Sequence, residues 1–199
     1  MFSGIIKSTG KVESVESLGS NKILWVSSDL SSSLSIDQSI AHDGVCLTVT
    51  ELNSHSHKVE VVMETLKKTT IDQWKPGSVI NLEKAISPLT LLDGHLVQGH
   101  ADTILICIKI TDLAGSWRMD FNLPSAFSGF IIPQGSVCIN GVSLTVADLD
   151  ETSFSVAVIP YTFNHTSFKY LREGNPVNVE FDMIGKYIVR QMELRSITE

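Results

Sequence analysis

Apolar and polar residues alternate along several short stretches of the chain, which is typical of β-strands. Residues 59–63, 78–83 and 153–158 place an apolar, often β-branched residue at every second position. The dipeptides Asp43-Gly44 and Asn140-Gly141 lie between such stretches and are typical of hairpin turns that need positive φ. Several short strands within about a hundred residues favour a small closed barrel, because closure leaves no strand edge exposed.

This pattern occurs twice along the chain. Residues 44–49 (Gly-Val-Cys-Leu-Thr-Val) and 141–146 (Gly-Val-Ser-Leu-Thr-Val) are related by an offset of 97 residues, and the same offset relates Gly77 to Gly174. Near the start of each copy, Gly4 corresponds to Gly99 at an offset of 95. One register held through separated blocks indicates a duplicated unit, and a period this long indicates two domains rather than a solenoid. We expect a mainly β fold with domains at residues 1–94 and 95–183.

The end of the chain has a helical pattern instead. Ile184, Tyr187, Ile188 and Met192 recur at helical spacing with charged residues between them. We therefore expect a helix over residues 184–199. Its apolar stripe needs a covering surface, which is either one of the barrels or other copies of the helix in an oligomer, and the pattern favours neither.

Composition narrows the class of partner. With 43% hydrophobic and 19% charged residues the chain can bury a core. The net charge of −7 argues against nucleic acid or an anionic membrane as a partner, because both need a basic surface. The apolar stretch at residues 104–108 is far shorter than the ~20 residues that span a bilayer. The odd number of cysteines, without a C-x-x-C pair or an export signal, leads us to expect a reducing cytoplasm.

Two kinds of reactive site are disfavoured by spacing. His95 and His100 are five residues apart, which suits neither the i, i+4 zinc pair of a helix nor one face of a strand. Ser143, His100 and Asp102 could form a nucleophilic triad, but no G-x-S-x-G elbow surrounds the serine. Glycine-rich phosphate-binding motifs are absent from the sequence as well. We therefore expect neither a metal site nor a bound cofactor.

Small polar side chains recur at matched places of the two copies. Cys46 and Thr48 correspond to Ser143 and Thr145, and each pair shares one face of its strand. Thr65 and its counterpart Thr162 add a hydroxyl on what we expect to be a following strand. Two related pockets edged by hydroxyl groups suit a flat, polar heterocycle.

At these motifs the chain resembles riboflavin synthase of the alpha-chain type, over nearly its whole length. The start (residues 1–6), the blocks 39–49, 93–102 and 135–146, and the segment 178–187 are similar to that family's motifs in order. The resemblance implies two tandem Greek-key six-stranded β-barrels, a C-terminal α-helix, and a homotrimer held partly by that helix. It also implies association with lumazine synthase.

The same resemblance implies the last step of riboflavin biosynthesis. Two molecules of 6,7-dimethyl-8-ribityllumazine exchange a four-carbon unit, which gives riboflavin and 5-amino-6-(ribitylamino)uracil. Each barrel is expected to hold one lumazine, and the active site is expected between the N-terminal barrel of one subunit and the C-terminal barrel of a neighbour.

The resemblance also implies which residues line the pockets. Those of the N-terminal barrel are Gly4, Ile5, Ile6, Cys46, Leu47, Thr48, Glu64 and Thr65. Those of the C-terminal barrel are Gly99, His100, Ala101, Ser143, Leu144, Thr145, Ile159 and Thr162, with Gln134 at the rim. Catalytic or orienting roles are implied for His100, Ser143, Cys46 and Ser39, and Asp182 is expected to complete the interface.

The sequence departs from the family's motifs at two positions. Gln134 stands where a lysine is common, which removes a cation from the pocket rim, and Asn140 stands where aspartate is frequent, although a turn accepts either.

Two alternative functions are open. One alternative is a non-catalytic lumazine or flavin carrier, which needs only one good pocket. The other is the flavin-binding barrel of a reductase, for which no adjoining nucleotide-binding domain is visible. Both copies keep the G-x-x-L-T-V block, and this favours the enzyme.

Overall fold

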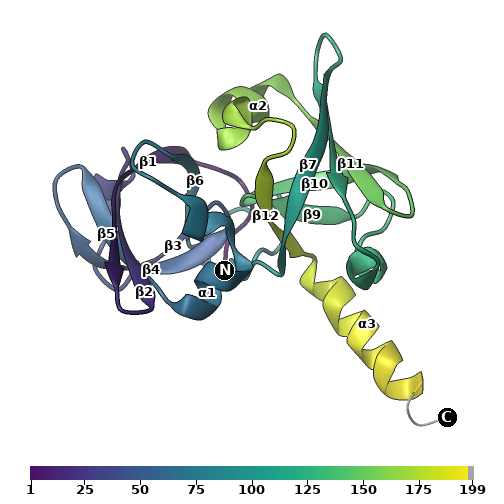
Figure 1. Cartoon of the computed structure of the whole chain (residues 1–199), viewed down its shortest axis with the longest axis horizontal. Coiled ribbons are helices and arrows are strands. Elements are labelled where there is room, and N and C mark those ends of the chain that lie inside the picture. The colour runs from purple at the N-terminus through teal and green to yellow at the C-terminus, as the bar shows by residue number, and fades with distance from the viewer. Residues whose placement is uncertain (197–199) are drawn as a thin grey trace.

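The computed structural model describes residues 1–196 and consists of two closed antiparallel β-barrels followed by a helix (Figure 1). The first barrel contains β1 (Ser8–Leu18), β2 (Asn21–Ser27), β3 (Ser39–His42), β4 (Val45–Leu52), β5 (Ser56–Val61) and β6 (Val79–Lys84). The second contains β7 (Thr103–Asp112), β8 (Trp117–Asn122), β9 (Ser136–Ile139), β10 (Val142–Leu149), β11 (Ser153–Val158) and β12 (Pro176–Phe181).

Strand order is the same in the two barrels. It runs β1-β2-β5-β4-β3-β6 around the first barrel and β7-β8-β11-β10-β9-β12 around the second. In each barrel three consecutive strands form hairpins and the next strand returns to pair beside the first of them, which is the Greek-key arrangement. The expected mainly β fold of two six-stranded barrels with a C-terminal helix is confirmed.

The alternating pattern of the sequence becomes the inside and outside of each barrel. In β4, Val45, Leu47 and Val49 are buried in the core, while Cys46 and Thr48 face outward. The turn before β4 has positive φ at both residues, 43° at Asp43 and 79° at Gly44. These angles match the hairpin turn that the Asp-Gly dipeptide predicts.

Two short helices were not expected from the pattern. The strand expected over residues 59–63 ends at Val61, and α1 (Met63–Lys68) begins directly after it. Thr65 lies on α1, and Thr162 lies on α2 (Pro160–His165), so the expectation that both lie on strands is wrong. Pro160 suits the first turn of α2, because its fixed φ is that of a helix and its missing N–H has no partner there anyway.

The C-terminal helix, α3 (Met183–Ser196), projects away from the second barrel (Figure 1). It begins one residue earlier than expected, and residues 197–199 of the expected helix lie outside the described residues. The Asp182 carboxylate accepts a hydrogen bond from the Ile184 backbone N–H at 2.9 Å, and Lys186 forms an ion pair with Asp102 at 2.9 Å. Ile184, Tyr187, Ile188 and Met192 are 55–66% exposed, so the stripe is not covered by a barrel of the same chain.

Within residues 1–196, no helix combines the length and the apolar character needed to cross a membrane.

The two barrels meet at their matched hairpin turns, 43–44 and 140–141. The Asn81 side chain donates to the Asn140 carbonyl at 2.9 Å, and the Asn178 side chain donates to the Asp43 carbonyl at 3.0 Å. A Cβ on Gly44 would lie 2.7 Å from the backbone nitrogen of Gly141, so only glycine fits this contact. Because each barrel donates the same bond to the other, the two barrels are related by an approximate twofold rotation.

Candidate functional site

The candidate site is built on the outward face of β4 and on the matching face of β10. Cys46 and Thr48 are half-buried and exposed, respectively, and Ser143 and Thr145 repeat that pattern in the second barrel. The sequence pattern therefore placed these pairs on one face of their strands, as the structure does.

The segment that leads into the second barrel crosses the pocket face of the first. The Cys46 N–H donates to the Gly99 carbonyl at 2.8 Å, and a Cβ on Gly99 would lie 2.6 Å from the Cβ of Cys46. Three N–H groups of this segment, at Gln98, Gly99 and His100, donate to the buried carboxylate of Glu180 at 2.6–2.8 Å. The carboxylate holds the segment against β4 through charge-assisted bonds.

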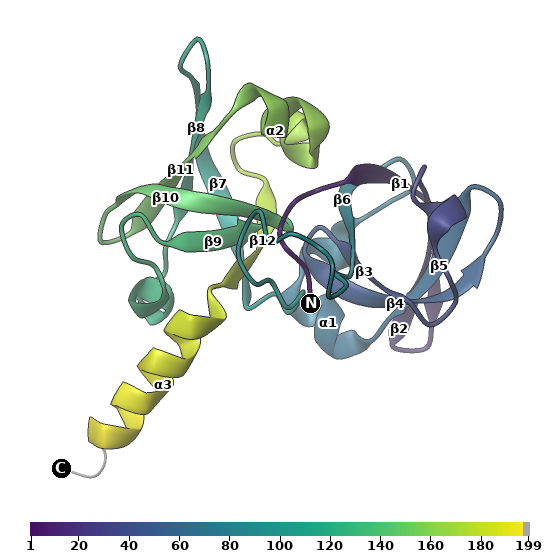
Figure 2. The same cartoon turned by 180° about the vertical axis from the view of Figure 1, so that it is seen from behind.

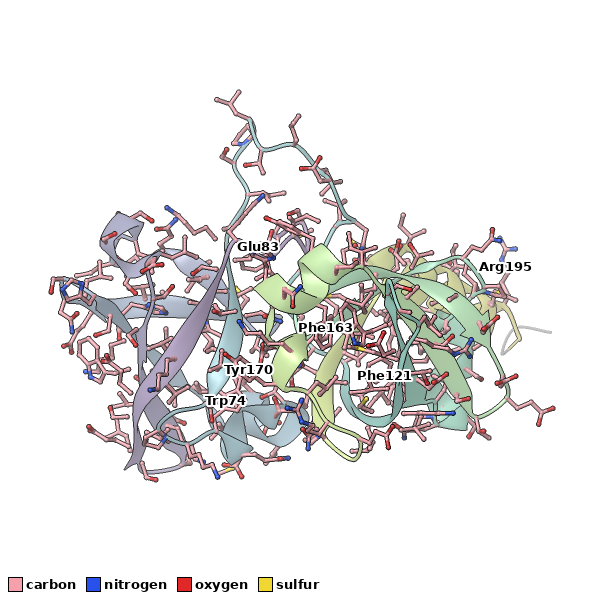
Figure 3. All side chains as sticks on the ribbon, turned by 90° about the horizontal axis from the view of Figure 1, so that it is seen from above. Trp74, Glu83, Phe121, Phe163, Tyr170 and Arg195 are labelled. Carbon is pink, nitrogen blue, oxygen red and sulfur yellow. The ribbon has the colours of Figure 1, made fainter. Side chains whose placement is uncertain are left out.

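The N-terminal segment makes the reciprocal contact with the second barrel. It lies at the junction of the barrels in both views (Figures 1 and 2). The Ser143 N–H donates to the Gly4 carbonyl at 2.8 Å. The N–H groups of Ser3 and Gly4 and the Ser3 hydroxyl donate to Glu83, which lies close to the junction (Figure 3), at 2.6–3.0 Å. Burial raises the pKa of the Glu83 carboxyl, and these bonds oppose that rise.

The grouping of pocket residues expected from the sequence is therefore corrected. Gly99, His100 and Ala101 belong with the first barrel, and Gly4, Ile5 and Ile6 belong with the second. The physical reason is the approximate twofold rotation, which carries the leading segment of each unit across the other barrel. Phe2 and Val97 pair with each other at the crossing point.

A hollow of about 250 Å³ lies on the first barrel where these parts meet. One wall comes from β4, one from α1, and one from the crossing segment. Its lining residues are Val45, Cys46, Glu64, Thr65, Lys68, Thr69, Gly99, His100 and Ala101. Thiol, hydroxyl and imidazole groups thus surround a shallow space, as expected for binding a flat polar ring.

The repeat places the corresponding residues together on the second barrel. Thr166 donates to the Thr162 carbonyl at 2.7 Å, as Thr69 donates to the Thr65 carbonyl at 2.8 Å in the first barrel. Ser143 takes the place of Cys46. The residues that correspond to the lining of the hollow are Val142, Ser143, Tyr161, Thr162, His165, Thr166, Gly4, Ile5 and Ile6.

Ser143 has a partner that the sequence did not reveal. The Nδ1 atom of His95 lies 2.7 Å from its hydroxyl oxygen. Burial lowers the pKa of His95, while the negative charge of Asp182 works in the opposite direction. A largely neutral imidazole beside a hydroxyl can accept a proton, so this pair can take part in proton transfer. In the sequence, His95 was considered only as a metal ligand together with His100. Its contact with Ser143 depends on the path of the segment that joins the two barrels.

Several other expected site residues lie apart from the hollow. The side chains of Leu47 and Leu144 point into the barrel cores, because they alternate with Cys46 and Ser143. Ile159 is 59% exposed at the start of α2, and Ser39 pairs with Thr48 across β3 and β4.

Gln134 lies in the turn before β9, with φ of 62° and its N–H donating to Val146. In β9, Cys138 is the residue opposite Ser143, so Gln134 lies roughly 13 Å along the strand from that point. Within one chain, Gln134 is therefore separated from Ser143, and its expected place at a pocket rim stays a prediction.

Among residues 1–196, no group of three or more histidine, cysteine, aspartate or glutamate side chains is placed to hold a metal ion.

The comparisons with known proteins agree with this architecture. The lumazine binding domain family matches residues 3–85 and again 98–182. The chain is 35% identical over 191 residues to the riboflavin synthase of Bacillus subtilis, with 96% of this chain and 89% of that protein covered. It is 34% identical over 192 residues to the riboflavin synthase of Photobacterium phosphoreum, with 96% and 88% covered.

A solved structure, LumP complexed with riboflavin, has the same fold, with a TM-score of 0.86 and 20% identity over 92% of this chain and all of that one. The repeated domain and the relatives that match along nearly the full length show that the chain belongs to the riboflavin synthase family.

Proposed function

We propose that the chain converts two molecules of 6,7-dimethyl-8-ribityllumazine into riboflavin and 5-amino-6-(ribitylamino)uracil. The observation that supports this most directly is that the three parts lining the hollow of the first barrel, a strand face, a short helix and a crossing segment, recur at matched residues of the second barrel. A reaction between two identical molecules needs two related pockets. The transfer of four carbons from one ring system to the other balances all atoms, so no external oxidant or reductant is required.

The pockets would contribute mainly by orientation. Holding two reactants in contact can lower a barrier by about 7–11 kcal/mol. The N–H groups of residues 98–100 donate to Glu180, so these amides are not the donors that a ring carbonyl would meet. The side chains of Cys46, Thr65 and His100 line the first hollow and can supply donors in their place.

Proton transfer is assigned to the imidazoles near the pockets. The 7-methyl group of the lumazine is acidic through conjugation, so a positioned base of ordinary strength suffices. His100 lies at the first pocket, and His95 with Ser143 lies at the second. We assign a proton-accepting or orienting role to these groups, with Ser39 and Asp182 as supporting residues.

We further propose that the active site forms between chains of a homotrimer. The apolar stripe of α3 is exposed, and a helix with such a stripe needs a partner to cover it. A chain ending at Asp182 is expected to lose the trimer, measured as solution mass by light scattering. The substitution Ile188→Glu should have the same effect, and Gln191→Glu, at an exposed polar position of the same helix, should not. An unchanged trimer in the truncated chain would contradict this assembly.

Residues 1–94 and 95–183 are then the two lumazine-binding domains, and residues 184–199 the oligomerisation segment. We also propose that the protein is located in the cytoplasm and associates with lumazine synthase.

The decisive experiment gives the purified protein only 6,7-dimethyl-8-ribityllumazine. We expect one riboflavin for every two substrate molecules consumed, followed by absorbance and by separation of the products. Tight binding without turnover would overturn the proposed reaction and favour a lumazine carrier.

A further inference from the structure

A second hollow lies on the first barrel, away from the candidate site. It is a groove of about 580 Å³ between β1, the end of β2, the turn that joins β4 to β5, and one tyrosine of the second domain. The residues that line it include Lys11, Ser27, Ser28, Asp29, His55 and Tyr170. The groove shares no lining residue with the hollow beside Cys46. Nothing in the proposed reaction accounts for it.

The second copy keeps the backbone of this groove and replaces its polar side chains. The Ser28 N–H donates to the His55 carbonyl at 3.1 Å, and the Leu123 N–H donates to the Thr152 carbonyl at 2.7 Å, so the two places are equivalent. Strand pairing gives the same register for β1 and β7. The positions Thr9, Lys11, Ser28 and Asp29 thus correspond to Ile104, Ile106, Leu123 and Pro124. Because apolar residues suit the same backbone, the fold does not require a polar lining here.

Hydrogen bonds within the chain hold the groove in shape. The Ser167 N–H donates to the Asn81 side chain at 2.6 Å and fixes the short 3-10 helix at Ser167–Tyr170 against the first barrel. Tyr170, labelled in Figure 3, is 54% exposed, so its ring stays accessible at the end of this helix. On the opposite wall, the Ser28 hydroxyl accepts from the Leu30 N–H at 3.2 Å. A ligand meets an ordered surface, which reduces the entropy lost on binding.

The polar groups of the groove favour a neutral ligand that can donate hydrogen bonds. The Ser27 hydroxyl donates to the Lys11 carbonyl at 3.3 Å, and the Ser32 hydroxyl donates to the Asp29 carbonyl at 3.2 Å. Because these hydrogens are used, both oxygens offer only lone pairs to a ligand. The Asp29 carboxylate also only accepts, and its charge balances that of Lys11. A carboxylate or a phosphate dianion presents acceptors alone, whereas each hydroxyl group of a sugar both donates and accepts.

We propose that this groove binds a neutral polyol, a sugar or a sugar alcohol. Its hydroxyl groups donate to Ser27, Ser32 and Asp29, the Lys11 ammonium donates to it, and its C–H groups pack on the Tyr170 ring. The volume of the groove lies in the range of small-molecule sites. Since the groove is separate from the hollow beside Cys46, the inference does not depend on the proposed function.

The test is a titration of the isotope-labelled full-length protein with ribitol, a small neutral polyol, followed through backbone amide chemical shifts. We expect saturable shifts at Gly10, Ser28 and His55, with a dissociation constant in the millimolar range. Ser28→Leu gives the groove a residue of the second copy and should weaken binding about tenfold, as should Tyr170→Ala. Tyr170→Phe should bind like the parent protein, because the ring makes the contact. Ser17→Leu, at an exposed serine of β1, is the matched control.

Absence of saturable shifts would overturn the polyol site, as would shifts confined to the surroundings of Cys46 and Gly99. Equal affinity in the parent protein and in Ser28→Leu, or an equal loss in Ser17→Leu, would also overturn it. Inorganic phosphate, titrated alone, should leave the groove unshifted, and tighter binding of phosphate than of ribitol would identify an anion site instead. Circular dichroism checks the fold. If Ser28→Leu does not fold, Lys11→Ile, at an exposed position, carries the same expectation.

Discussion

A buried pair of histidines in the first barrel predicts that the stability of the fold falls in mild acid. His42 and His57 are both fully buried, and their Nε2 atoms lie 2.8 Å apart. His42 Nδ1 lies 3.2 Å from the Ile40 carbonyl, which can only accept, so this nitrogen carries the proton. His42 Nε2 then accepts from His57, and His57 Nδ1 accepts from the Ser31 hydroxyl at 2.9 Å. Every ring nitrogen of the two histidines therefore already has a hydrogen-bond partner. A proton added to either ring must break one of these hydrogen bonds.

Burial lowers the pKa of both histidines. That of His57 falls from 6.5 to about 4, and that of His42 lies well below 6.5, with repulsion from His57 adding to the burial and the Ile40 carbonyl opposing it. The unfolded chain binds the proton more tightly than the folded chain. The stabilisation is therefore complete above pH 6.5 and is lost as the pH falls from there towards about 4.

For His57 alone, the cost follows from the two pKa values. One pKa unit corresponds to about 1.4 kcal/mol, so the full loss is about 3 kcal/mol, of which about 2 kcal/mol is reached by about pH 5. The assay is urea unfolding of the parent protein and of His57→Gln, whose amide can donate to His42 and accept from Ser31 without titrating. Between about pH 7.5 and about pH 5 the parent should lose about 2 kcal/mol more than the variant.

His55→Gln is the control, because His55 is an exposed histidine two residues away. It should follow the parent protein. Equal pH dependence of the free energy of unfolding in the parent and in His57→Gln would refute the reasoning.

Three further predictions concern the contact between the two barrels and the pockets. Burial raises the pKa of Asp43 to about 7, so stability is lost as the pH rises through that value; between about pH 6 and about pH 8 the parent should lose about 1 kcal/mol that Asp43→Asn keeps, measured by urea unfolding. Gly99→Ala adds a Cβ at φ of 82° and within 2.6 Å of β4, and should cost about 2–3 kcal/mol and raise KM. Gly77→Ala, with φ of 96° but no neighbour within 4 Å, should cost only about 1 kcal/mol, and equal costs would contradict the packing argument. His95→Gln should lower kcat about tenfold or more with little change in KM if it accepts a proton through Ser143, and an unchanged kcat would assign His95 to structure alone.

The barrels were predictable because their signals are local. Alternation at residues 78–83 and 153–158 reproduces β6 and β11 within a residue or two, and the Asp43-Gly44 dipeptide specifies its own turn. The short helices were missed because six residues carry less than two helical turns. Val62 and Met63 also continue the apolar character of β5, so nothing in the pattern marks the end of that strand.

The composition of each pocket could not be predicted in the same way. The match between Gly4 and Gly99 identifies the two leading segments, but their destination depends on how the barrels pack on each other, which is a long-range property. One signal was present in the sequence. Glu83 and Glu180 are matched carboxylates within the last apolar strand of each copy, and a buried carboxylate needs several donors. Those donors proved to be the N–H groups of the two leading segments.

The backbones of the two copies are more alike than the side chains at their candidate pockets. Each copy keeps a glutamate that holds the leading segment of a domain, and an asparagine that bonds to the turn of the other barrel. The differences lie where a ligand would touch, with Cys46 against Ser143 and Glu64 against Tyr161. Two identical substrates must meet in fixed orientation, yet one gives four carbons and the other receives them. Matched backbones can supply the common orientation, and only unequal side chains can make the two molecules behave differently. The duplication thus accounts for two matched binding surfaces, and the divergence between its copies supplies the inequality that a transfer between identical molecules requires.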